Sequence, residues 1–246
     1  MSDSQPSDAL SMHDSIIDNI HKFLEESSPS LTKNTDQIIL ALLARLLCGA
    51  DSVSTLSNYK RYAYIPVILR SMLEARIDLI NLVQNSDYIK IMTYKFSQQE
   101  IKFLDCEIMN SSKDDSSSTK QLMIERFDKA MTYCEENSNI ANDSRIRERF
   151  DQADLISEYF VTYNLLCRSS HNNIDQLIAD HFPYGGTRFF THTSSTTNNI
   201  ILRMFMSANM CVHGAEIVAH HFHITGSHLE ETKEQYKKLE LLVQTN

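Results

Sequence analysis

The chain has 246 residues, which is long enough to bury one substantial core, and its composition requires no second domain. Only 5 glycines and 4 prolines are present, too few for the many tight turns of a sheet protein. The net charge of −9 argues against an overall attraction to nucleic acid, although a local basic cleft is compatible with it. The composition predicts an all-α, single-domain antiparallel bundle spanning residues 1–246, with about seven to nine helices.

The cysteines and the apolar runs indicate a cellular compartment. The 5 cysteines are odd in number and form no C-x-x-C, so neither a disulfide framework nor a zinc knot is expected. The opening MSDSQPSDAL lacks the basic and apolar regions of an export signal. Arg45 and Arg203 interrupt the apolar runs well short of the ~20 residues of a membrane span. We therefore expect a cytoplasmic protein with reduced thiols and no membrane association.

Apolar residues recur at helical spacing along most of the chain. The first helix is expected to end near the break at residues 27–29, and a strongly apolar helix should cover residues 34–56. Pro66 suits the first turn of a third helix, which should end near Gln84. Further helices are predicted over residues 87–109, 120–136, 152–168 and 172–182. The Pro66 helix and the helix containing Tyr159 have the densest apolar faces and are expected at the centre of the bundle.

The remaining segments are expected to be connections or C-terminal helices. NSSKDDSSST, residues 110–119, reads as a mobile loop, and the charge-dense segment before residue 152 reads as a looser connection. Residues 183–199 should form a long surface loop, a kind of segment that often carries function. An apolar arc predicts a helix over residues 198–223. The last helix should place Leu229, Tyr236, Leu239 and Val243 on one stripe.

The Pro66 helix carries the first candidate site. At ~100° per residue, its polar side chains fall within an arc of about 80°, opposite the apolar face. These side chains are Arg70, Glu74, Asp78 and Asn81. Arg76 points instead into the apolar side. Arg70 and Glu74 are either an ordinary i,i+4 ion pair or an arginine held by a carboxylate at a phosphate-binding cleft.

The second candidate site lies in residues 159–177, YFVTYNLLCRSSHNNIDQL. Tyr163, Cys167 and His171 are spaced by four, so a continuous helix places them on one stripe beside Tyr159 and Phe160. His171 is then either a hydrogen-bonded core histidine or a general acid or base near neutral pH. In the second case, Arg168 and Asn172 are close enough in sequence to assist.

The third candidate is a polar stripe on the helix of residues 198–223. Asn209, His213, Glu216 and His220 follow one another at i, i+4, i+7 and i+11, so two imidazoles and a carboxylate could share a divalent metal. The ferritin-like Glu-x-x-His spacing would need a histidine at position 219, where the chain has Ala219. A solvated polar face is the favoured interpretation.

Several common catalytic signatures are missing from the sequence. No glycine-rich turn is present, which excludes the phosphate cradles of P-loop and dinucleotide-binding proteins. Neither G-x-S-x-G nor H-E-x-x-H occurs. Any active site must therefore be assembled from helical side chains, and no cofactor or metal is expected in it.

Two motifs resemble a known family. ILRSMLEARIDLINLVQNSDY, residues 68–88, and YNLLCRSSHNN, residues 163–173, resemble a family of uncharacterised microbial helical proteins. That family has an R-x-x-x-E helix followed by a Y-x-x-x-S-x-x-x-H segment, with Cys167 here in place of the serine. It is similar to the HEPN superfamily (higher eukaryotes and prokaryotes nucleotide-binding).

The resemblance implies a HEPN-like helical bundle that acts on RNA or nucleotides. Such a protein could be a metal-independent endoribonuclease effector of a toxin–antitoxin or phage-defence system, working as a homodimer or with a partner protein. HEPN ribonucleases carry R-x(4–6)-H on one helix, and that spacing is absent here because Arg168 lies three residues before His171. Arg70 and Glu74 from another helix would have to take the place of the missing arginine of that motif.

The implied roles follow from that replacement. Arg70 would bind phosphate, Glu74 would position the arginine and His171 would transfer the proton, with Arg168, Asn172 and Tyr163 contacting substrate. Two alternatives stay open. The acidic balance and the missing spacing favour a non-catalytic interaction or regulatory module, and the stripe of His213, Glu216 and His220 would suit a metal-binding bundle.

Overall fold

The computed structural model describes residues 4–110, 118–170, 178, 182 and 196–245, and these residues are almost wholly helical. They contain no strand, and they form nine helices when the continuous segment 156–170 is counted as one. The all-α prediction and its expected number of helices are confirmed. Most of the predicted helix 172–182 and of the predicted loops 110–119 and 183–199 lies outside the described residues.

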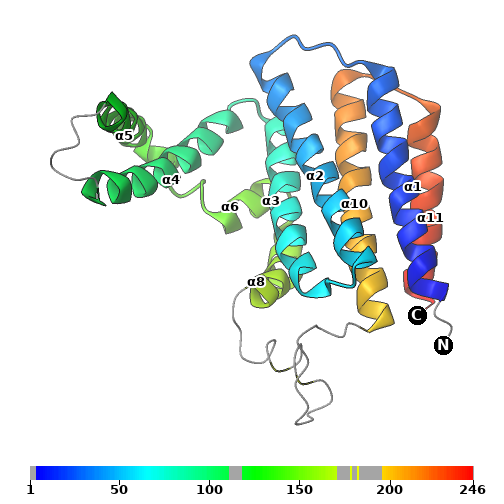
Figure 1. Ribbon diagram of the computed structural model, residues 1–246. Helices are drawn as coiled ribbons and strands as arrows, with labels where there is room; N and C mark the ends of the chain where they lie inside the picture. The colour runs from blue at the N-terminus through cyan, green and yellow to red at the C-terminus, as the bar shows by residue number, and fades with distance from the viewer. Residues whose placement is uncertain (1–3, 111–117, 171–177, 179–181, 183–195, 246) are drawn as a thin grey trace.

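Five long helices lie side by side and form the bundle, with sequence neighbours antiparallel (Figure 1). The helices predicted over residues 34–56, 66–84 and 198–223 begin and end within a few residues of those bounds, and the first helix ends at the predicted break. Pro66 occupies the first turn of its helix as expected. The helices are α1 (Ser4–Ser27), α2 (Asn34–Asn58), α3 (Ile65–Gln84), α10 (Thr197–Phe222) and α11 (Ser227–Gln244).

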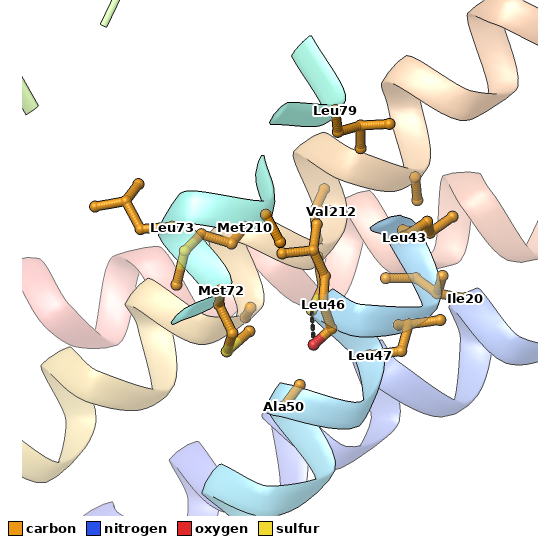
Figure 2. Close-up of a cluster of buried hydrophobic side chains, with 14 of the residues drawn as sticks. Ile20, Leu43, Leu46, Leu47, Ala50, Met72, Leu73, Leu79, Met210 and Val212 are labelled. Carbon is orange, nitrogen blue, oxygen red and sulfur yellow. Dashed lines mark hydrogen bonds between the residues drawn. The ribbon is translucent and has the colours of Figure 1, made fainter. Parts of the chain in front are cut away.

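Helices α2 and α10 pack closely in the core. A Cβ atom added to Gly214 of α10 would lie 2.7 Å from Leu46 Cδ1 and 3.2 Å from Leu43 Cδ1. A glycine at this position therefore lets the two helices approach closely. Figure 2 shows these leucines with Leu79 and Met210, which are also buried in the same cluster.

One helix in the described part of the chain, α2, is long and apolar enough to cross a membrane by length and composition alone. Its apolar residues Ile39, Leu43, Leu46 and Leu47 are buried within the core of the bundle. The core helix of a soluble protein passes the same test, so this result is weak evidence for a membrane span.

The helix containing Tyr159 does not lie at the centre of the bundle, so that prediction is wrong. It comprises α7 (Ile156–Glu158), the π-helical turn η3 (Tyr159–Tyr163) and α8 (Asn164–Ser170), and it packs on one side of α3. Three of its large apolar side chains, Phe160, Val161 and Leu165, remain exposed. The central helices are α2, α3 and α10, the last with twelve buried residues.

The charge-dense segment before residue 152 is more ordered than predicted. It contains the 3-10 turn η2 (Ser138–Ile140) and α6 (Ile146–Gln152). A helix of seven residues is too short to be stable alone and depends on tertiary packing. Because four of its residues are charged, α6 shows no apolar arc in the sequence, although Arg149 and Phe150 are buried against the rest of the protein.

Helices α4 (Tyr88–Asn110) and α5 (Ser118–Glu136) pack against each other and project from the bundle as a hairpin (Figure 1). Tyr94, Leu104 and Ala130 are buried within the hairpin but lie outside the main core cluster. The hairpin therefore has a small apolar core of its own.

The N-terminus of α2 is held by a buried carboxylate. Asp36 accepts hydrogen bonds from the backbone amides of Thr32 and Lys33, each at 2.8 Å, and His221 Nε2 of α10 lies 3.1 Å from its other oxygen. Burial acts to raise the pKa of Asp36, but these hydrogen bonds outweigh it and hold the pKa well below the ordinary 3.8. Asp36 thus joins the start of α2 to the end of α10.

We expect Asp36→Asn to destabilise the protein by about 1–2 kcal/mol at pH 7, because it removes a charged helix cap. A carboxylate with a depressed folded-state pKa contributes stability that is complete above its unfolded pKa and is lost as the pH falls below it. The difference between variant and wild type should therefore shrink as the pH drops below 3.8. Urea denaturation from pH 7 to pH 3 measures it, with exposed Asp18→Asn as the control. A difference that stays constant over this range would contradict the assignment.

Candidate functional site

The polar side of α3 faces three other elements in the structure. Arg70, Glu74, Asp78 and Asn81 follow one another along it, as the periodicity predicts. Glu74 contacts α4 and η3, while Asp78 and Asn81 contact α6. The arc predicted from the sequence is therefore the surface to which α4, α6 and η3 attach.

Four side chains, Arg70, Glu74, Lys95 and Tyr163, form what we call the Arg70 cluster. Arg70 Nε lies 3.4 Å from Glu74 Oε1, and the Arg70 guanidinium lies over the Tyr163 ring, 5.3 Å from its centroid. The Tyr163 hydroxyl donates to the same Glu74 oxygen at 3.1 Å, and Lys95 Nζ lies 3.7 Å from Glu74 Oε2. One carboxylate therefore holds two cations and a tyrosine from three different elements.

The cluster is open to solvent and electrostatically asymmetric. The side chains of Arg70, Glu74 and Lys95 are 27%, 28% and 32% exposed, whereas Tyr163 is buried. Burial and the nearby Glu74 charge raise the pKa of Tyr163, so its hydroxyl stays protonated and acts as a donor. Burial, followed by the Arg149 charge, lowers the pKa of Lys95. The arrangement suits anion binding better than proton abstraction by tyrosine.

A second network lies next to this cluster and was not predicted. Arg149, only 1% exposed, donates to Asp78 Oδ1 from Nε at 3.0 Å and also from Nη2. The Tyr88 hydroxyl donates to the same oxygen at 2.7 Å, and Asn81 Nδ2 donates to the Arg149 carbonyl at 2.9 Å. Sequence spacing gives no signal for a partner 71 positions away. Only the position of Asp78 on the polar arc indicates that such a partner exists.

Arg76 lies on the apolar side of α3, as predicted, and is buried there. Its guanidinium forms an ion pair with Glu158 at 3.1 Å, and its Nε donates to His213 Nδ1 at 3.0 Å. Burial and the Arg76 charge lower the pKa of His213. Arg76 therefore connects α3 to both α7 and α10.

The contact with Arg76 bears on the metal alternative. His213 Nδ1 already accepts a hydrogen bond, Glu216 pairs with Lys233 at 3.7 Å, and His220 is exposed. Within the described residues, no group of three or more His, Cys, Asp or Glu side chains could hold a metal ion. This stripe behaves as a polar face with partners of its own.

The structure brings together some of the predicted site residues. Arg70, Glu74 and Tyr163 meet in one cluster, and Cys167 lies near enough to interact electrostatically with Arg70. Arg168 is exposed on α8. His171 and Asn172 lie outside the described residues. Lys95 is the member that the sequence did not indicate, because α4 has only a weak helical pattern.

The fold and the cluster define an all-helical protein whose polar residues converge on one side of a central helix. The chain belongs to a family of unknown function, DUF5677, which matches residues 36–183, more than half of its length. The match includes the whole Arg70 cluster and its neighbouring network. No curated protein and no solved structure was found to match the chain.

We expect Asp78→Ala and Arg149→Ala each to destabilise the protein by about 3–5 kcal/mol, because each leaves a buried charge without its partner. The double variant should lose clearly less than the sum of the two, which chemical denaturation and a double-mutant cycle will show. The exposed pair Asp87 and Lys90 is the control, where the same truncations should cost below about 1 kcal/mol. Additive effects at Asp78 and Arg149 would contradict the proposed coupling.

Proposed function

We propose that the protein binds the phosphate groups of RNA or nucleotides at the Arg70 cluster. The observation that carries this proposal is the sharing of one carboxylate, Glu74, by two partly exposed cations, Arg70 and Lys95. The neighbouring Arg149 is matched by Asp78, so the two networks together keep one positive charge in excess. A local excess of this kind supports anion binding even in a chain with a net charge of −9.

The geometry of Arg70 supports phosphate as the bound group. A guanidinium offers a planar fork of donors that matches two phosphate oxygens. Here Glu74 holds it on one side and the Tyr163 ring lies against its face, so little side-chain freedom is left to lose on binding. Lys95 adds a second positive charge from α4.

We further propose a HEPN-like, metal-independent ribonuclease activity. The RNA 2′-oxygen would attack the adjacent phosphorus while the bond to the 5′-oxygen breaks, giving a cyclic phosphate and a 5′-hydroxyl. In this scheme Arg70 stabilises the phosphate charge, His171 accepts the 2′-hydroxyl proton, and a water molecule protonates the departing 5′-oxygen. The resemblance to HEPN proteins adds the setting: a cytoplasmic, homodimeric effector of a toxin–antitoxin or phage-defence system.

Phosphate binding is tested with labelled RNA and fluorescence anisotropy. We expect Arg70→Ala to weaken binding about tenfold, equivalent to ~1.4 kcal/mol, and to lower the salt dependence of binding by about one counterion. The RNA affinity of Arg70→Lys should fall between those of wild type and Arg70→Ala, because lysine keeps the positive charge but lacks the planar fork of donors. The exposed hairpin variant Arg126→Ala is the control. Equal affinities of wild type and Arg70→Ala would refute the binding site.

Cleavage is tested separately with labelled tRNA and mRNA. We expect His171→Ala to slow cleavage by about 100-fold or more while leaving RNA affinity unchanged, because general acid–base groups contribute rate enhancements of this order. His21→Ala, an exposed histidine on α1, is the matched control. Equal cleavage rates for wild type and His171→Ala would end the ribonuclease proposal and leave the binding proposal standing.

A non-catalytic interaction module is the second candidate, and one observation favours it. The hairpin of α4 and α5 projects from the bundle (Figure 1). It carries large exposed apolar side chains, which mark protein contact sites when they cluster. These are Phe96, Phe103, Met109 and Leu122. The RNA experiment separates the two functions, because a partner-binding hairpin requires no RNA affinity at Arg70.

A further inference from the structure

Aromatic rings and guanidinium groups form a continuous series that extends beyond Arg70. From Arg70 over Tyr163, the series passes to the Tyr159 ring, stacked on Tyr163 at 5.7 Å and 19°. The Phe160 ring follows at 5.3 Å from Tyr159, and the Arg147 guanidinium lies 5.9 Å from the Phe160 centroid. We call these five residues the aromatic track.

Two rings of the track, Tyr159 and Tyr163, pack on a buried phenylalanine. The buried Phe150 ring of α6 lies 5.5 Å from Tyr159 and 5.3 Å from Tyr163. These contacts fix two of the three rings of the track by packing. Tyr159, Phe160 and Tyr163 all come from the π-helical turn η3, a local geometry that is frequent at functional sites.

The third ring of the track, Phe160, is more exposed than Tyr159 and Tyr163. Phe160 is 56% exposed, and it lies between the partly buried Tyr159 and the exposed Arg147. Phe160 packs edge-on against the fixed Tyr159 ring, and the Arg147 guanidinium lies over the Phe160 ring. An exposed ring with a cation close to it is an arrangement on which nucleic acid bases stack. The track thus combines one open stacking surface with a guanidinium at each end.

We propose that the aromatic track binds single-stranded RNA, with an unpaired base stacked on Phe160 and backbone phosphates at Arg147 and Arg70. This inference rests on the proposed phosphate-binding function and names its substrate class. Bases inside a duplex stack on each other and present no free face, so the track should select unpaired RNA. Because every base has such a face, stacking gives little preference for sequence.

The test compares a labelled single-stranded oligoribonucleotide with the same strand annealed to its complement, by fluorescence anisotropy. Wild type should bind the single strand more tightly. Phe160→Leu should weaken single-strand binding about tenfold, within the range of alanine substitutions at stacking residues. Phe160→Tyr should restore it. Phe103→Leu changes an equally exposed phenylalanine on the hairpin and should behave as wild type.

Three results would overturn this inference, and they differ in whether the proposed phosphate site also fails. If Phe160→Leu binds as wild type while Arg70→Ala is impaired, the track is wrong and the phosphate site stands. If wild type binds neither RNA, the proposed function fails as well. If Phe160→Leu converts a dimer to a monomer in sedimentation without RNA, the exposed surface around Phe160, with Val161 and Leu165, is a protein interface instead.

Discussion

Two buried guanidinium groups, Arg76 and Arg149, attach the segment 146–163 to α3. Removing such charges from water is costly, and only a complete set of partners compensates for it. Arg149 has Asp78 and Tyr88, and Arg76 has Glu158 and His213. Since α6 and α7 are too short to be stable alone, these contacts determine where the short helices lie.

The Arg70 cluster depends on this attachment. Tyr163 follows Glu158 by little more than one turn, and its ring packs on Phe150, the residue next to Arg149. The chain connection to Glu158 and the packing on Phe150 therefore hold the Tyr163 ring in the position where it contacts the Arg70 guanidinium. A binding group held by packing loses less conformational freedom when its ligand arrives, which favours affinity. The buried networks thus support the exposed cluster without belonging to it.

What could be predicted from the sequence was local. The period of α3 placed Arg70, Glu74 and Asp78 on one side, and the spacing of four between Tyr163 and Cys167 indicated a shared stripe. The ion pairs that were missed involve distant partners. Arg149 pairs across 71 positions from a seven-residue helix, and Lys95 reaches Glu74 from a helix of weak periodicity.

Phe160 shows how a small change in helical geometry alters an inferred face. In a regular helix it would share the inward stripe with Tyr163, three residues later. The wider π-helical turn leaves Tyr159 and Tyr163 stacked against Phe150 and turns Phe160 outward, beside Arg147. An exposed ring is ordinary when isolated. This one extends a series of ring contacts that ends at Arg70, so the net charge of the chain does not describe the local charge of this face.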